Sequence, residues 1–299
     1  MNWRQLWAIT VGHDPSVDFL HPLIAALLFY IIAYTACFTF YTISYQLFPN
    51  SLKIYILDFF KTLVICSYPY GHGLVRSFAG HVGYCAVAVP LVMLTLHTFK
   101  EGSPSPLSVF EDFLAKKLSL FKTLVRIVVQ TAAGFASFRL VHLIWSLEFH
   151  PDHVKSMRAV GCDTDLKVSI FVGFLIEMMG VLYDTWLSYQ PLFRFSLLDE
   201  AVKTLNGTIL VCLGLHLTGM YMQPAMASGL SFGCKGTSAW EHVLVYWVGA
   251  FLGCYGAIVL NKYVHFSLVK GKDKSVTNGH RKGVKNGLHG KNTKLKRSN

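Results

Sequence analysis

Long apolar stretches separated by short polar ones dominate the chain. A membrane-crossing helix needs about 20 predominantly apolar residues. Seven stretches come close to or exceed this length: 22–45, 54–70, 74–99, 120–147, 168–189, 201–221 and 242–260. A polar loop is expected at 148–167. The pattern therefore predicts an all-α membrane protein.

Two polar, proline-containing segments interrupt this pattern at membrane depth. In 216–234, Thr218-Gly219 ends one helix and Gln223-Pro224-Ala225 begins another that is long enough for only half a span. Proline is well tolerated in the first turn of a helix, where its missing N–H would have no partner. In 101–110, a Ser/Pro-rich segment leads into a short helix predicted at 111–117. Non-helical backbone survives at this depth only inside protein or beside water, so both segments are candidate pore elements.

The two broken segments belong to an internal repeat. Asp58 precedes Ser105 by 47 residues, and Glu177 precedes Gln223 by 46. Each half reads as an acid-bearing span, a second span, a half-helix and a third span, which is typical of inverted-repeat transport proteins. The third spans carry pairs of residues at helical spacing that favour close packing: Gln130 and Gly134, and Gly249 and Gly253. The stretch 22–45 is an additional first helix.

Composition supports a membrane protein and locates its charge. The 299 residues are 53% hydrophobic and 14% charged, with a mean hydropathy of +0.43. The net charge is +11, and 262–299 alone carries eleven Lys/Arg against one acid, Asp273. So few apolar residues predict a disordered tail. A cytosolic tail beside an anionic membrane surface explains this charge better than nucleic-acid binding does.

One stretch identifies a family by its resemblance. The sequence TGMYMQPAMASGLSF at 218–232, followed by YWVGAFLG at 246–253, resembles the second signature of the aquaporin family. Gln223 replaces the usual Asn and Met226 the usual Arg, which is similar to the divergent superaquaporin subfamily. The resemblance implies an aquaporin-like inverted repeat of six transmembrane helices plus two re-entrant half-helices, with an extra N-terminal hydrophobic helix. The alternative is a proline-kinked helix in another multispan protein.

The resemblance also implies how the broken segments act. It places Ser105-Pro106-Leu107 and Gln223-Pro224-Ala225 where family members carry the two pore motifs, whose amides donate hydrogen bonds to the permeating molecule. The half-helices are expected to meet with their N-termini together, and their dipoles oppose cations there. Ser105 offers a hydroxyl in place of an amide, and Gln223 is one methylene longer than Asn. Both departures predict behaviour unlike that of an ordinary water channel.

The same resemblance implies a selectivity filter. Met226 stands where family members place an arginine, so the filter loses a charge and its donors and gains a flexible apolar wall. We expect it to admit water, glycerol and hydrogen peroxide. The alternative is that Met226 packs away from the lumen. The other filter positions are expected near Cys85 and within 211–214, which includes Val211 and Gly214.

Two acids inside spans are expected to have a partner and a role. The resemblance implies that Asp58 and Glu177 accept hydrogen bonds from backbone N–H groups and so support the half-helices. The alternative is a proton relay. A disulfide between Cys162 and Cys234 is one option for the two cysteines expected outside the membrane, and leaving them free is the other. No metal site, no cofactor and no enzyme signature is found, so the chain is not expected to be an enzyme.

These expectations define an organisation. The N-terminal segment 1–51 holds the extra helix, 52–261 forms the channel domain, and 262–299 is the cytosolic tail. Seven spans would put the N-terminus on the lumenal or extracellular side, whereas a packed, non-spanning first helix would leave it cytosolic. The tail ends near Lys296-Arg297, close to a retrieval signal, which favours the endoplasmic reticulum over the plasma membrane. The family implies a homotetramer in a lipid bilayer, and a poorly conducting membrane scaffold is the alternative function.

The topology makes the sequon at Asn206 testable. It falls at the cytosolic start of a span, where glycosylation does not occur. We expect glycosidase treatment of the expressed protein to leave its electrophoretic mobility unchanged, and Asn206→Gln to migrate like the wild type. A glycosidase-sensitive shift that disappears in Asn206→Gln would invert the topology.

Overall fold

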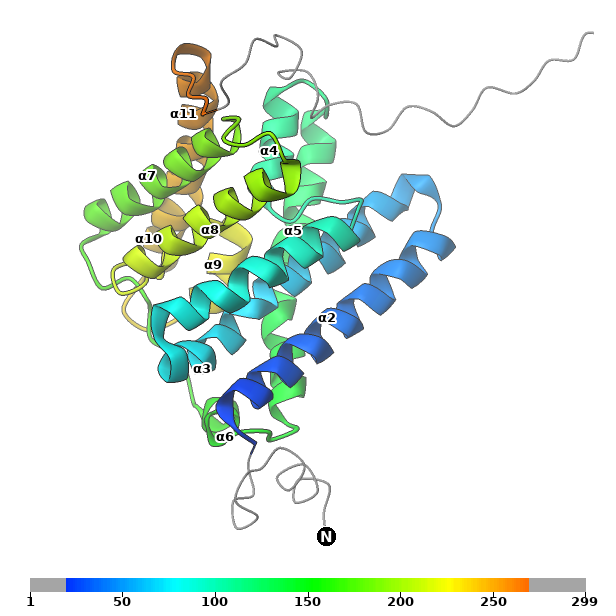
Figure 1. The fold of residues 1–299 in the computed structure, drawn as a ribbon, viewed down its shortest axis with the longest axis vertical. Coiled ribbons are helices and arrows are strands. Elements are labelled where there is room, and N and C mark those ends of the chain that lie inside the picture. Colours follow the sequence, from blue (N-terminus) through cyan, green and yellow to red (C-terminus); the bar gives the residue numbers. More distant parts are fainter. Residues whose placement is uncertain (1–19, 269–299) are drawn as a thin grey trace, which may run out of the picture.

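The structure, a computed structural model, describes residues 20–268, and within them it is built from helices without strands (Figure 1). The predicted all-α membrane fold is confirmed. The elements are α2 (Pro22–Leu47), α3 (Asn50–Thr98), α4 (Pro106–Leu114), α5 (Leu120–Trp145), α6 (Pro151–Arg158), α7 (Ile170–Ser188), α8 (Ser196–Gly214), α9 (Pro224–Ser231), α10 (Ala239–His242), the π-helix η1 (Val243–Val248) and α11 (Gly249–Tyr263). The basic tail predicted for 262–299 lies almost wholly outside the described residues, as does most of the predicted N-terminal segment before α2.

The second and third predicted spans form the two arms of α3, and the turn between them lies later than predicted. Gly80, with φ 64° and ψ −161°, breaks the helix. Lys61 Nζ donates to the Phe99 carbonyl at 2.6 Å, and the Tyr68 and Thr95 hydroxyls are 2.7 Å apart, so the arms run antiparallel. The expected break near 71–73 is wrong, because those residues continue the helix.

Other boundaries also differ from the predicted ones. The first half-helix begins at Pro106, directly after its N-cap Ser105, and not at 111. The span predicted at 201–221 is α8, which ends at Gly214. A turn at 215–218 follows, and then irregular backbone with positive φ at Gly219, Met220 and Met222 leads to Gln223. The last span begins at Ala239 and passes through η1 into α11. The loop at 148–167 contains α6, whose N-cap is His150 and whose first residue is proline.

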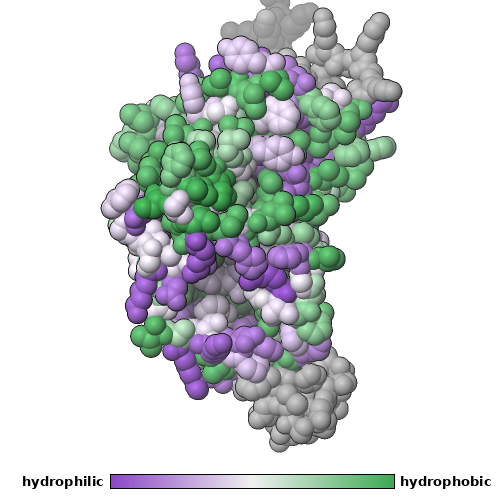
Figure 2. Space-filling model, turned by 90° about the vertical axis from the view of Figure 1, so that its left-hand side faces the viewer, coloured by the Kyte–Doolittle hydropathy of each residue, from purple (hydrophilic) through white to green (hydrophobic). Residues whose placement is uncertain are grey.

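Within the described residues, five helical stretches are long and apolar enough to cross a membrane: α2, α3, α5, α7 and the run from α10 to α11. Since α3 folds back at Gly80, it provides two crossings. Helix α8 packs against α3 and α7, but Asp199, Glu200 and Lys203 make its first turns polar. On the face shown in Figure 2, hydrophobic side chains form a broad zone, and hydrophilic ones gather beside it around a hollow.

The half-helices α4 and α9 meet at their N-terminal ends. The amide of Gln223, the N-cap of α9, donates from Nε2 to the carbonyl of Pro104, just before α4, at 2.6 Å. Helix α9 also lies tightly on α5. A Cβ on Gly134 would lie 2.1 Å from the Ala225 carbonyl oxygen, and one on Gly229 would lie 2.2 Å from the Gly134 carbonyl oxygen. Glycine is therefore required at this crossing.

The extra helix α2 is an integral part of the bundle. It packs along α3 and α5, and its side chains Phe29, Tyr30 and Tyr41 belong to the largest hydrophobic core. The backbone N–H of Leu20 donates to the Phe149 carbonyl at 3.0 Å, which ties its start to the segment before α6. In Figure 1, the start of α2 and the end of α11 lie at opposite ends of the molecule.

Helix α6 closes the end of the bundle where α2 begins. His153 packs against the ring of Phe29 with centroids 6.2 Å apart, and its side chain is buried. Burial, and secondarily the neighbouring His150, lowers the pKa of His153 to about 4. The ring is therefore neutral at neutral pH and packs as part of the core.

The glycine crossing gives a stability prediction. We expect Gly134→Ala to lower the melting temperature of the detergent-purified protein, because its methyl group meets backbone that must move, at a cost of about 1–3 kcal/mol. Tryptophan fluorescence during heating measures it. Gly73→Ala is the matched control, since no atom lies within 4 Å of its added Cβ. Equal melting temperatures for the two variants would contradict the close approach.

Candidate functional site

A cavity of about 630 Å³ lies between the two halves of the bundle, lined mainly by α3, α8, the segment 215–222 and α9. At one end it is lined by Arg76, Asp165 and Lys167, from the end of the first α3 arm and the segment before α7. At the other end it is lined by Asp184 and Lys203, near the end of α7 and the start of α8. The 19 residues of α7 rise by roughly 28 Å. The cavity therefore extends over most of a bilayer's apolar thickness.

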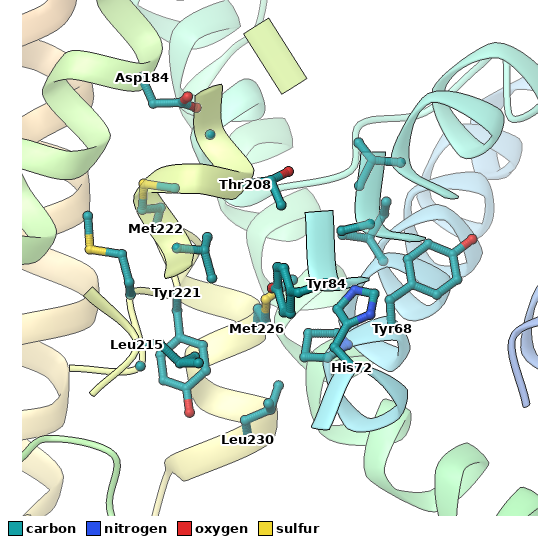
Figure 3. A pocket seen from close by; sticks show the side chains of 18 of the residues that line it. Tyr68, His72, Tyr84, Asp184, Thr208, Leu215, Tyr221, Met222, Met226 and Leu230 are labelled. Atoms are coloured by element: carbon teal, nitrogen blue, oxygen red, sulfur yellow. The ribbon is translucent and has the colours of Figure 1, made fainter. Parts of the chain in front are cut away.

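The middle of the cavity is mainly apolar. Met220, Met222 and Met226 line it, together with aromatic side chains from α3. Figure 3 shows Met226 beside Tyr84 and His72, with Asp184 further along the cavity in one direction and Leu230 in the other. Methionine is flexible and polarisable, and it donates no hydrogen bond. This stretch therefore provides an adaptable wall without a fixed charge.

The structure brings only part of the predicted filter together. Met226 and Val211 line the cavity, whereas Cys85 and Gly214 are not among its lining residues in the described chain. Gly214 lies behind Met220, whose Sδ would be 2.7 Å from an added Cβ. The loop after α8 is therefore inserted between Gly214 and the lumen, and the sequence pattern gave no sign of this insertion.

The predicted motif residues hold the half-helices and leave the lumen to other side chains. Gln223 Nε2 is bound to the Pro104 carbonyl, and its Oε1 accepts a long hydrogen bond from Cys66 Sγ at 3.6 Å. Ser105 Oγ accepts from the backbone N–H of Leu107 at 3.2 Å as an N-cap. Within the described residues, no residue of either motif lines the cavity. The Gln223 amide thus joins the second half-helix to the segment that precedes the first.

Glu177 of α7 organises the broken backbone before α9. Its carboxylate accepts from the Thr218 hydroxyl at 2.7 Å and from the backbone N–H groups of Tyr221 at 3.2 Å and Met222 at 2.9 Å. Thr218 Oγ1 in turn accepts from the Met220 N–H at 3.1 Å. Buried backbone donors are costly when unpaired. The carboxylate therefore fixes the segment that carries the methionines.

This segment is also strained. Met220 and Met222 have φ values of 45° and 50°, a region that is uncommon for residues other than glycine. Such conformations cost of order 1–3 kcal/mol each and persist only when the surroundings hold them. Here the hydrogen bonds to Glu177 and Thr218 hold them, and both methionine side chains line the cavity.

Comparisons with known proteins agree with this geometry. No family model matches the sequence. Aquaporin-11 of Milnesium tardigradum is 23% identical over 257 residues, which are 86% of this chain and 93% of the relative. Aquaporin-12 of Mus musculus is 29% identical over 170 residues, 55% of this chain and 57% of the relative. Aquaporin SIP1-1 of Arabidopsis thaliana is 28% identical over 145 residues, 48% of this chain and 57% of the relative.

The chain is a divergent member of the aquaporin family. It is an integral membrane protein with the architecture of an aquaporin-type channel. The curated relatives it matches are named as aquaporins and not as enzymes.

The first half of this aquaporin fold is held by charge. Asp58 accepts from the Ser103 N–H at 2.7 Å, and Arg126 binds the same carboxylate through Nε at 2.5 Å and Nη2 at 2.8 Å. Lys61 Nζ donates to the carbonyls of Phe99 and Gly102. Sequence reasoning missed Arg126, although an arginine within the apolar stretch 120–147 was a signal that it needs a buried partner.

A disulfide joins the loops at the Arg76 end of the cavity. Cys162, before α7, is bonded to Cys234, after α9. Backbone hydrogen bonds continue the connection, since Lys235 N donates to the Cys162 carbonyl at 2.9 Å and Thr164 N to the Lys235 carbonyl at 2.8 Å. The Tyr221 hydroxyl donates to Asp165. The cavity mouth is thus cross-linked from both sides.

The buried ion pair gives a prediction about stability. Arg126→Met should lower the melting temperature markedly, because the isolated Asp58 charge costs about 3–5 kcal/mol. Adding Asp58→Asn to Arg126→Met should recover part of this loss. Thermal unfolding in detergent measures both.

Arg139→Met is the control for this experiment, because Arg139 lies on the same helix and is exposed. We expect it to melt like the wild type. If Asp58→Asn lowers the melting temperature of Arg126→Met as much as it lowers that of the wild type, the two charges do not stabilise one another.

Proposed function

We propose that this chain conducts water and small neutral solutes passively, with glycerol and hydrogen peroxide among the candidates. The observation that carries the proposal is the cavity between the two halves of the bundle, which has polar side chains at both ends and methionines in its middle. A long apolar lining excludes ions, since a charge inside it would lose its hydration without compensation. Met226 in place of a cationic residue removes a barrier to solutes larger than water.

The two half-helices add an electrostatic barrier. The N-terminal ends of α4 and α9 meet next to the cavity and are joined through Gln223 and Pro104. Helix N-termini carry partial positive charge. In a narrow, low-dielectric lumen this charge disfavours protons and other cations. The proposed selectivity is therefore for neutral molecules.

Stopped-flow light scattering on proteoliposomes tests the proposal. We expect water efflux and glycerol uptake well above those of empty vesicles. Met226→Arg should reduce glycerol uptake at least about tenfold, which corresponds to about 1.4 kcal/mol on the permeation barrier, and should affect water less. Met226→Leu is the matched control, because it keeps an apolar wall of similar size. Glycerol uptake that is the same in all three proteins would remove Met226 from the filter.

A membrane scaffold with little conduction is the second candidate. It is favoured by the engagement of Gln223 and Ser105 in structural hydrogen bonds, since neither residue lines the cavity. Folded, reconstituted protein that passes neither water nor glycerol would establish this alternative.

The wider setting is part of the same proposal. We place the channel in 52–261, with α2 as its addition, and expect a homotetramer with one pore in each protomer. A membrane of the endoplasmic reticulum is favoured, with the basic C-terminal tail in the cytosol. The opposite placement of the start of α2 and the end of α11 supports an N-terminus on the other side.

A further inference from the structure

Gln223 and Ser105 do not line the cavity, so other groups must offer hydrogen bonds to a molecule in its middle. Water and glycerol need hydrogen bonds along the way, because crossing an apolar stretch without any is costly. Gln223 and Ser105 are bound elsewhere, and the three methionines donate none. Another group must serve at the level of Met226.

His72 of α3 is such a group. It lines the cavity, and Figure 3 shows it together with Tyr84 and Met226. Its ring centroid lies 4.7 Å from that of Tyr84. One ring nitrogen, Nδ1, is 2.7 Å from the Tyr30 hydroxyl. Among the described residues, Nε2 has no hydrogen-bond partner. This atom is not fully buried. That nitrogen is available to the cavity.

Tyr30 belongs to the extra helix α2, and close packing fixes it. A Cβ on Gly71, next to His72, would lie 2.7 Å from atoms of both the Phe29 and the Tyr30 rings. The Tyr30 ring also packs against Tyr68 with centroids 6.1 Å apart. Tyr30 is buried, so its hydroxyl cannot swing away to solvent. The phenol therefore holds the imidazole in one orientation.

We propose that His72 is the polar contact for permeating molecules beside Met226, and that Tyr30 of α2 is the residue that positions it. This inference rests on the proposed conduction and deepens it. In either tautomer, the bond to Tyr30 uses one nitrogen and leaves the other as a single donor or acceptor. A single such group suits small hydroxylic molecules, namely water, glycerol and hydrogen peroxide, which exchange hydrogen bonds readily.

Reconstituted variants test this role by flux. We expect His72→Leu to lower water permeability about tenfold, since a lost hydrogen bond is worth about one such factor. His72→Gln keeps a donor and an acceptor and should retain about half of the wild-type value or more. Tyr30→Phe should fall between and should change the ratio of glycerol to water permeability, because the ring is present but no longer held. Phe29→Leu is the control for packing against Gly71 and should keep the wild-type ratio.

A chemical measurement separates this inference from the conduction itself. Diethylpyrocarbonate acylates accessible neutral imidazoles, and peptide mass spectrometry assigns each site in the folded, reconstituted wild type. We expect His72 to react more slowly than the exposed His97 but well before His242, which is buried at 1% exposure. Tyr30→Phe should change the rate at His72 and leave the rate at His242 unchanged.

The outcomes are distinct. If the wild type conducts and His72→Leu has the same permeability and the same solute ratio, the role of His72 is overturned and the proposed conduction stands. Absence of wild-type flux would remove the proposed conduction and, with it, this role, even if His72 reacts. A His72 that reacts no faster than His242 would show that its free nitrogen does not face the cavity.

Discussion

Backbone that leaves a helix at membrane depth must find hydrogen-bond acceptors inside the protein, and the rest of this structure depends on that constraint. Glu177 meets it for the second half-helix by accepting from Tyr221 and Met222. These bonds hold a segment in which two methionines adopt left-handed conformations. The wall of the cavity is therefore set by a buried carboxylate that does not itself line it.

The two halves meet the same constraint by different means. Asp58 accepts one backbone N–H and is neutralised by Arg126, whereas the partners of Glu177 are a hydroxyl and backbone groups. The charged half also keeps Lys61 on the carbonyls of its loop. The inverted repeat thus preserves the positions of the acids while their surroundings have diverged. The half beside α2 is held by the charged side chains Asp58 and Arg126. The half that carries the methionines is held by hydrogen bonds from a hydroxyl and backbone N–H groups to Glu177.

Much of the architecture could be predicted from the sequence because it follows from local rules. Apolar length located most of the spans, and Gln223-Pro224 located the start of the second half-helix. The first half-helix begins at Pro106, five residues before its predicted start. What failed depends on tertiary contacts. Gly71 and Gly73 suggest a turn in the sequence, but the turn is at Gly80. Gly71 instead lies where α2 approaches so closely that a side chain would collide with Phe29 and Tyr30. The orientation of Gln223 followed from a carbonyl 119 residues away, which no local pattern reveals.

The altered pore motifs and the additional helix both affect which polar groups line the cavity. The Gln223 amide donates to the Pro104 carbonyl, which joins the half-helices and directs this donor away from the lumen. Helix α2 reaches the opposite wall of that lumen through Tyr30 and His72. An ordinary inverted repeat without α2 would have no phenol at this place, and an unheld imidazole would be free to adopt other rotamers. The extra helix therefore contacts a residue of the cavity wall as well as the outside of the bundle, and Gly71 permits the close approach that this contact needs.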